Sequence, residues 1–228
     1  MSGDVQILLH GTNCLRCFIA NFHGQLIERG YCDMILSTVA RLLSPTLNES
    51  AAPHLGYCLV QTFDKISPKV DQDLVLACVT KLYKSKMPSI VQGLVLVCAR
   101  LIHLNPNALV SFLLDMTVER RPGLKVLMDK WLIHQPLIRG KYTKNATVSA
   151  LARLFTLKDK RLEALLVIGF NPSRSNLSPE VPAPLKILST LIRCLDNEAA
   201  PRKVKVGQVQ GRNEEFSTVV DAGGWRAY

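Results

Sequence analysis

The chain is poor in aromatic residues, which make up 6% of its 228 residues, and it has no long apolar run. A transmembrane helix needs about 20 mostly apolar residues. The longest candidate here, residues 90–104, is interrupted by Gln92, Arg100 and His103. The first ten residues, MSGDVQILLH, lack both the basic segment and the apolar core of a signal peptide. We therefore expect a soluble intracellular protein that makes no contact with a membrane.

The motifs of several enzyme classes are absent as well. The phosphate-binding patterns GxxxxGKS/T and GxGxxG do not occur, and neither do GxSxG or HExxH. The five histidines are scattered and acidic residues are sparse, so no cluster predicts a catalytic or metal site. We expect no enzyme activity, no metal and no cofactor. The alternative is a cysteine-based activity at Cys14 or Cys17.

The seven cysteines are an odd number and do not indicate a disulfide framework. Cys58, Cys78 and Cys98 lie in apolar helical stretches, where a thiol packs as a small core residue. Cys14 and Cys17 form a CxxC motif, but no second ligand pair accompanies it to complete a zinc site. The surroundings are helical, unlike the βαβ context of a redox motif. We interpret this pair as ordinary residues of one helix face.

Apolar residues recur at helical spacing through most of the chain, in runs separated by Pro, Gly, Asn and Ser. The clearest example is residues 123–162, where two apolar stripes flank a corner at Pro136 and Gly140. The first stripe consists of Leu124, Leu127, Met128, Trp131 and Leu132, and the second of Val148, Leu151, Leu154 and Phe155. A helix pair cannot bury both stripes by itself, so this pair must stack on neighbouring pairs.

Such pairs recur near residues 31–66, 72–104, 107–135 and 142–166, with a period of about 35 to 40 residues. The pattern predicts an all-α fold, an α-solenoid of HEAT/ARM-like antiparallel helix pairs. An irregular helical domain and a closed bundle are the alternatives. Strand signals are weak before residue 195.

The composition also predicts how the chain is divided. We expect HEAT-like helical repeats over residues 1–170, followed by a Pro/Ser-rich linker over residues 171–184 and a final helix over residues 185–197. Periodicity then fades, so we expect residues 198–228 to form a disordered tail. Within this tail, residues 203–209 alternate like a strand but have no partner strand in the sequence.

The net charge of +10 is concentrated in residues 119–161, which hold 11 Lys/Arg against three Asp/Glu. Such a patch can attract acidic protein segments or phosphates. Its few aromatic residues include Trp131 and Phe155 of the two apolar stripes, so the region does not show the aromatic pattern of a base-stacking surface, and a solvated helix face explains it equally well. The candidate partner-binding residues are Lys141, Lys144, Arg153, Lys158, Lys160 and Arg161.

One family resemblance rests on residues 123–162. The order of Trp131, Gln135, Gly140 and Tyr142, followed by the SALARL run and DKRL, resembles a late repeat of a nuclear import receptor. The receptors it resembles form the importin-nine branch of the importin-beta (karyopherin-beta) superfamily. Weaker similarities in GTNCLR, SIVQGLVLVCARLIHL and PLKILSTLIRCL extend the resemblance over about residues 6–197. They are packing patterns, and they mark Trp131, Gly140 and Tyr142 as structural packing residues.

The resemblance implies a superhelical stack of HEAT repeats that carries basic protein cargo, histones and ribosomal proteins among them, between cytoplasm and nucleus. Such receptors release cargo under control of the GTPase Ran. The chain resembles only their C-terminal part, so we expect the Ran-binding repeats and the family's acidic loop to be absent. The predicted function is therefore a segment of a nuclear import receptor, a protein-binding scaffold for cargo recognition. The alternative is a nucleic-acid-binding or general scaffold protein that uses the basic residues 119–161.

Overall fold

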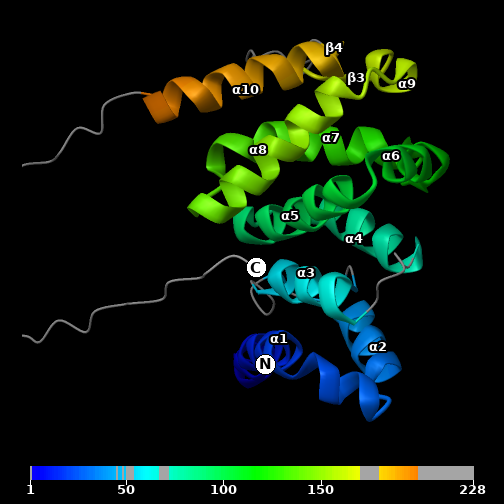
Figure 1. Ribbon diagram of the computed structural model, residues 1–228, viewed down its shortest axis with the longest axis vertical. Coiled ribbons are helices and arrows are strands. Elements are labelled where there is room, and N and C mark those ends of the chain that lie inside the picture. Colours follow the sequence, from blue (N-terminus) through cyan, green and yellow to red (C-terminus); the bar gives the residue numbers. More distant parts are fainter. Residues whose placement is uncertain are drawn as a thin grey trace, which may run out of the picture.

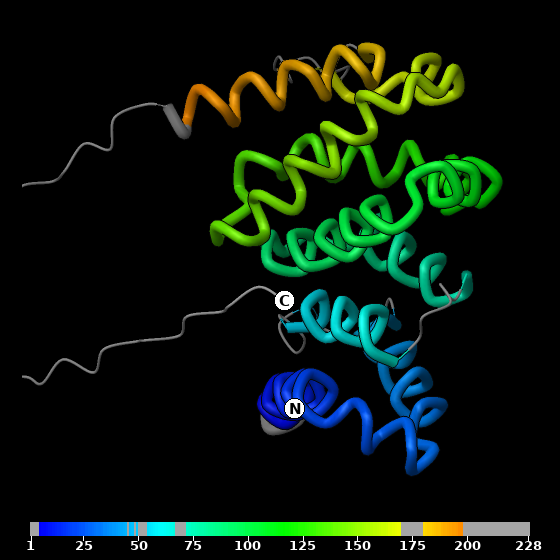
Figure 2. Tube along the Cα trace, in the orientation of Figure 1, coloured from blue at the N-terminus to red at the C-terminus, as the bar shows by residue number. Residues whose placement is uncertain are grey.

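The computed structural model describes residues 2–44, 46–47, 49, 54–66, 72–169 and 180–199, and these residues are mostly helical. The helices stack along the longest axis of the molecule, from α1 (Ser2–Glu28) at one end to α10 (Ala183–Ala199) at the other (Figure 1). The Cα trace advances steadily along this axis (Figure 2). The prediction of an all-α solenoid is confirmed.

One layer of the stack contains five helices, each packed on the next. They are α1, α3 (Leu55–Lys65), α5 (Pro88–Leu104), α8 (Lys141–Thr156) and α10. Between α1 and α10 the chain thus returns three times to the same layer, as expected of repeated helix pairs.

The other layer is built from α2 (Cys32–Leu42), α4 (Gln72–Lys84) and α7 (Gly123–His134). Helix α2 packs on α3, while α4 packs on both α5 and α7. Helix α6 (Pro106–Asp115) lies against α5 and α7. Two one-turn segments, η2 (Gln135–Leu137) and α9 (Lys160–Glu163), precede and follow α8.

Helix α5 is buried nearly all round because helices of both layers contact it. Helices α3 and α8 flank it within its own layer, and α4, α6 and α7 pack on it from the other. Eleven of its residues are buried, from Ile90 to Ile102. Cys98 is one of them, and Cys58 and Cys78 are buried in α3 and α4, which confirms their predicted place in the core.

Helices α5 and α3 approach each other closely at Gly93 and Gly56. A methyl group added to Gly93 would lie 2.9 Å from the Cα atom of Gly56, and one added to Gly56 would overlap the backbone of Gly93. A side chain at either position therefore cannot be accommodated by rotation of a flexible neighbour. The two glycines set the spacing of the layer at this point.

Buried polar contacts tie the segment after α2 to the next helix pair. The Lys81 ammonium of α4 is buried and donates hydrogen bonds to the carbonyl oxygens of Ser44 (2.8 Å) and Leu47 (2.9 Å). The Glu49 carboxylate accepts a hydrogen bond of 2.6 Å from the backbone N–H of Met87, the residue before α5. Burial lowers the pKa of Lys81, and the nearby Glu49 carboxylate partly offsets this effect. Two hydrogen bonds and one nearby carboxylate thus compensate the buried charge.

A second buried network forms the corner between α7 and α8. The Trp131 side chain is fully buried, and its Nε1–H donates to Gln135 Oε1 at 2.7 Å. Gln135 Nε2 in turn donates to Thr147 Oγ1 at 3.1 Å. Gly140, which precedes α8, has φ +83°, a left-handed conformation that favours glycine. The first predicted stripe, with Trp131, is buried throughout.

The second predicted stripe is only partly correct. Tyr142, expected to be a packing residue, is 57% exposed, and Phe155 is 39% exposed. The buried face of α8 instead follows Thr143, Thr147, Ala150, Leu151 and Leu154. Each residue advances about 100° around a helix, so Tyr142 and Phe155 lie beside this face rather than on it. Two threonines occupy core positions, so the apolar pattern alone misplaced the stripe.

Two short antiparallel strand pairs were not anticipated. β1 (Thr117–Val118) pairs with β2 (Arg121–Pro122), and β3 (Leu166–Ile168) pairs with β4 (Glu180–Pro182). The first turn places Glu119 and Arg120 at φ 48° and 65°, conformations that usually call for Asn or Gly. Strands of two or three residues are too short to show an alternating pattern, and this turn carries no glycine signal.

Within the described residues, the final helix begins earlier and ends later than predicted, which shortens the expected linker and tail. Residues 180–182, assigned to the linker, form β4, and the final helix begins at Ala183 and ends at Ala199. Residues 170–179 and 200–228, which hold the rest of the linker, the tail and the alternating run 203–209, lie outside the described part of the chain.

Replacing Gly93 with Ala is expected to destabilise the fold by about 1–3 kcal/mol because the added methyl meets the α3 backbone. Gly56→Ala should be at least as damaging. Gly11→Ala is the matched control, since nothing lies within 4 Å of a methyl group there. It should be neutral or stabilise α1 by up to about 1 kcal/mol. Urea unfolding followed by circular dichroism measures all three, and equal stability of Gly93→Ala and Gly11→Ala would contradict the proposed close approach.

Truncating Trp131 to Ala is expected to lower the free energy of unfolding by about 3–5 kcal/mol, because it empties a core position and leaves Gln135 without its donor. Tyr142→Ala, at an exposed position in the next helix, should change it by less than about 0.5 kcal/mol. Thermal and urea unfolding of both variants test the pair. A similar loss in both would mean that the corner does not depend on the buried indole.

Candidate functional site

The six basic residues predicted as a partner-binding patch are divided between two places. Lys141 and Lys144 lie in the first turn of α8, while Arg153 lies near its other end and Lys158, Lys160 and Arg161 follow it. Helix α8 has 16 residues and is therefore about 24 Å long. The six residues thus do not form one compact patch.

Two of the six bind within the chain. Arg153 Nη1 donates to the carbonyl oxygen of His103 at 2.8 Å, which links α8 to the end of α5. Arg161 pairs with Asp159 at 2.7 Å and donates to Ser111 Oγ of α6 at 3.0 Å. The hydrogen bond from Arg161 holds the pKa of Asp159 below its usual value. These two arginines stabilise the corner after α8 and are less available to a partner.

Other basic residues of the 119–161 region also serve the fold. The Arg121 guanidinium lies over the Tyr83 ring, 5.9 Å from its centroid. Lys125 Nζ donates to the Leu166 carbonyl oxygen at 2.6 Å. Lys130 Nζ donates to the Ser85 carbonyl oxygen at 2.7 Å. Part of the positive charge of residues 119–161 is therefore used in contacts within the chain. Fewer basic side chains are available to a partner than the sequence indicates.

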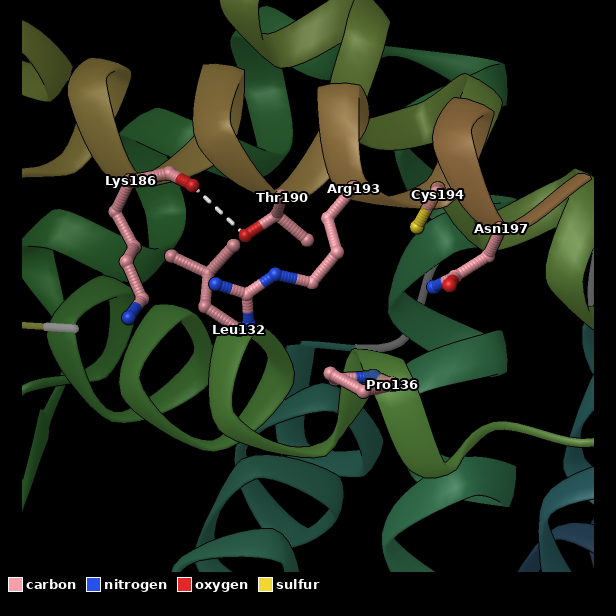
Figure 3. Close-up of a pocket in the computed structure, with 7 residues that line it drawn as sticks. All are labelled: Leu132, Pro136, Lys186, Thr190, Arg193, Cys194 and Asn197. Atoms are coloured by element: carbon pink, nitrogen blue, oxygen red, sulfur yellow. Dashed lines mark hydrogen bonds between the residues drawn. The ribbon is translucent and has the colours of Figure 1, made fainter. Parts of the chain in front are cut away.

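Two small hollows lie beneath α10, where it crosses α7, η2 and α8. The first has a volume of about 30 Å³, and its lining residues are drawn in Figure 3. The second, of about 70 Å³, shares Pro136, Cys194 and Asn197 with the first. We call the two together the α10 cleft. Its lining consists of Leu132, Gln135, Pro136, Lys144, Val148, Lys186, Thr190, Arg193, Cys194 and Asn197.

The described residues that line the α10 cleft include three cations and no acidic side chain. Lys186 is buried and its Nζ donates to the Gly169 carbonyl oxygen at 2.9 Å. Burial lowers the pKa of Lys186, and the positive charge of Arg193 lowers it further. Of the predicted patch, only Lys144 reaches this cleft. The sequence prediction missed Lys186 and Arg193, although their spacing of seven residues, two helical turns, places them on one face of α10.

An apolar groove lies elsewhere, between α4, α5 and α6. It has a volume of about 140 Å³ and is lined by Gln72, Val75, Leu101, Leu104, Asn105, Ala108, Leu109 and Phe112. Leu104 at its rim is 62% exposed.

Apolar side chains are also exposed at the two ends of the stack. Helix α10 carries a stripe at helical spacing that is 40% to 63% exposed, formed by Leu185, Leu188, Ile192 and Leu195. Helix α1 exposes Ile7, Phe18 and Phe22. Both helices thus pack on the stack through one side only.

The described residues contain neither a cluster of metal ligands nor a helix that could span a membrane. Cys14 and Cys17 are exposed on α1, and within the described residues no group of three or more His, Cys, Asp or Glu side chains could hold a metal ion. Among the helices described, none combines the length and the apolar character needed to cross a bilayer.

The comparison with known proteins points in one direction. No model of a protein family matches the chain. Over 171 residues, the chain is 31% identical to Importin subunit beta-5 of Saccharomyces cerevisiae. The match covers 74% of this chain but 17% of the yeast protein, so the chain spans a small part of that relative's length. Together with the helical stack, this similarity supports placing the chain in the importin-beta superfamily.

Proposed function

We propose that this chain is a segment of a nuclear transport receptor, a helical scaffold that binds protein cargo. The observation that carries the proposal is its similarity to Importin subunit beta-5 over 171 residues. The two-layered stack of helices supports it, because stacked repeats offer an extended surface to a protein partner. The residues around Trp131 further favour the importin-nine branch of the superfamily. The protein would act in the cytoplasm and the nucleus.

The cargo class follows from the same resemblance. We propose basic proteins, histones or ribosomal proteins, as cargo. The ammonium groups of Lys158 and Lys160 would repel such cargo. We therefore expect the corner after α8 to lie outside the cargo-binding surface. Ran would have to bind repeats other than those of this chain.

Nucleic-acid binding through the basic residues 119–161 is the rival function. Five of these residues make contacts within the chain: Arg121, Lys125, Lys130, Arg153 and Arg161. Phosphate binding needs cations that are free to neutralise the backbone. The candidate residues are also separated along α8, so they offer no continuous track for a strand. These observations favour a protein partner.

Pull-down of purified core histones or of a basic ribosomal protein by the immobilised chain tests this function. We expect retention at physiological salt, and we expect no gel shift with RNA at the same salt. Phosphate binding through the basic region would instead weaken steeply between low and physiological salt. RNA binding with that salt dependence, without retention of basic proteins, would favour the rival function.

Reversing Lys158, Lys160 and Arg161 to Glu should leave the binding of a basic cargo unchanged or make it stronger, because the change removes repulsion. Arg161 pairs with Asp159, so the triple variant also loses a local contact. The double variant Lys158→Glu/Lys160→Glu keeps that pair and serves as the control for folding. Isothermal titration with the cargo identified by pull-down measures both. Loss of cargo affinity in the well-folded double variant would show that this corner contacts cargo.

A further inference from the structure

We propose that the α10 cleft is a docking site for an acidic peptide segment of a partner protein. The site goes beyond the cargo function proposed above, because basic cargo would not enter a cleft lined by cations. Arg193 and Lys144 would bind carboxylates at its two sides, and Leu132, Pro136 and Val148 would contact the apolar parts of the peptide.

The cations approach the cleft from two elements. Lys186 and Arg193 are two turns apart on α10, and in Figure 3 their side chains descend from α10 toward α7 beside Leu132. Lys144 comes from α8 and lines the second hollow. Because Pro136 and Asn197 belong to both hollows, a short extended segment that follows the cleft would meet charge from both helices.

Two of the cations, Arg193 and Lys144, have no acidic partner among the described residues. Of the described residues that line the two hollows none is acidic, and the salt bridges found in this part of the chain involve neither Arg193 nor Lys144. Arg193 instead lies close enough to Lys186 for the two like charges to interact. An incoming carboxylate would relieve this repulsion, and a guanidinium can bind it through two parallel hydrogen bonds.

The lining favours a peptide over a nucleic acid. Its described residues include no aromatic side chain on which a base could stack. The Lys186 side chain is buried and donates a hydrogen bond to the Gly169 carbonyl oxygen, so it offers no exposed contact to a phosphate backbone. The apolar residues between the cations suit the side-chain methylenes of Glu or a neighbouring Leu. Hollows of about 30 and 70 Å³ accept single side chains rather than nucleotides.

Fluorescence anisotropy of the full chain with a short labelled peptide of Glu and Leu tests the proposal. We expect saturable binding that weakens with salt, and none by a peptide in which Lys replaces Glu. The variant Lys144→Glu/Arg193→Glu should weaken binding by about tenfold or more, and Lys144→Gln/Arg193→Gln by less. Arg41→Glu, at an exposed position on α2, is the matched control and should change the affinity by less than about twofold.

Circular dichroism of each variant ensures that the affinities compare folded proteins, and the neutral Gln variants carry the test if charge reversal disturbs the fold. Equal affinity of the wild type and the Lys144/Arg193 variants would overturn the proposal. Equal binding of the Glu and Lys peptides would overturn it too. Displacement of the Glu peptide by a single-stranded RNA that binds more tightly would assign the cleft to nucleic acid instead.

Discussion

The packing of α5 is the constraint on which the rest of the stack depends. Its neighbours in one layer are α3 and α8, and α4, α6 and α7 contact it from the other, so five helices take their positions from one. The contact with α3 is fixed by the meeting of two glycine backbones. Gln92, one residue before Gly93, binds the next pair through the backbone of Arg139, whose N–H donates to its Oε1 at 2.8 Å. A shift of α5 would therefore disturb the spacing on both sides.

The stripes that packing alone determines were predictable from the sequence. Leu124, Leu127 and Trp131 are buried because apolar side chains at spacings of three and four can only face a core. Helix α8 was harder, because Thr143 and Thr147 can occupy core positions when their hydroxyl groups have partners. The Thr147 hydroxyl donates to the Thr143 carbonyl oxygen within the helix, and the Thr143 hydroxyl lies 3.1 Å from the Tyr57 hydroxyl of α3. The apolar pattern therefore assigned burial to Phe155, and the family resemblance assigned a packing role to Tyr142, but both side chains lie beside the buried face of α8.

The candidate site was less predictable, because the charge of a residue does not indicate which groups its side chain contacts in the folded protein. Arg153 and Arg161 belong to the same basic region of the sequence as Lys144. In the structure, however, they are bound to His103 and Asp159. Lys186 and Arg193 lie beyond the basic region of the sequence, and the hollow that they line adjoins that of Lys144 only because α10 packs on α8. Such a meeting between residues about 50 positions apart depends on the stacking of helices, which local patterns do not encode.

The exposed apolar stripe of α10 makes this end of the molecule the helical counterpart of an open edge strand. An edge strand can pair with another chain because its backbone N–H and C=O groups are unpaired and regularly spaced. Helix α10 likewise exposes a regular row of apolar side chains, Leu185, Leu188, Ile192 and Leu195. If such a row met the exposed face of α1 on another molecule, the contact would join unlike surfaces. Contacts of that kind do not close after two copies. A partner or a further repeat that covers the α10 stripe would therefore also remove one of the two surfaces that such a contact needs.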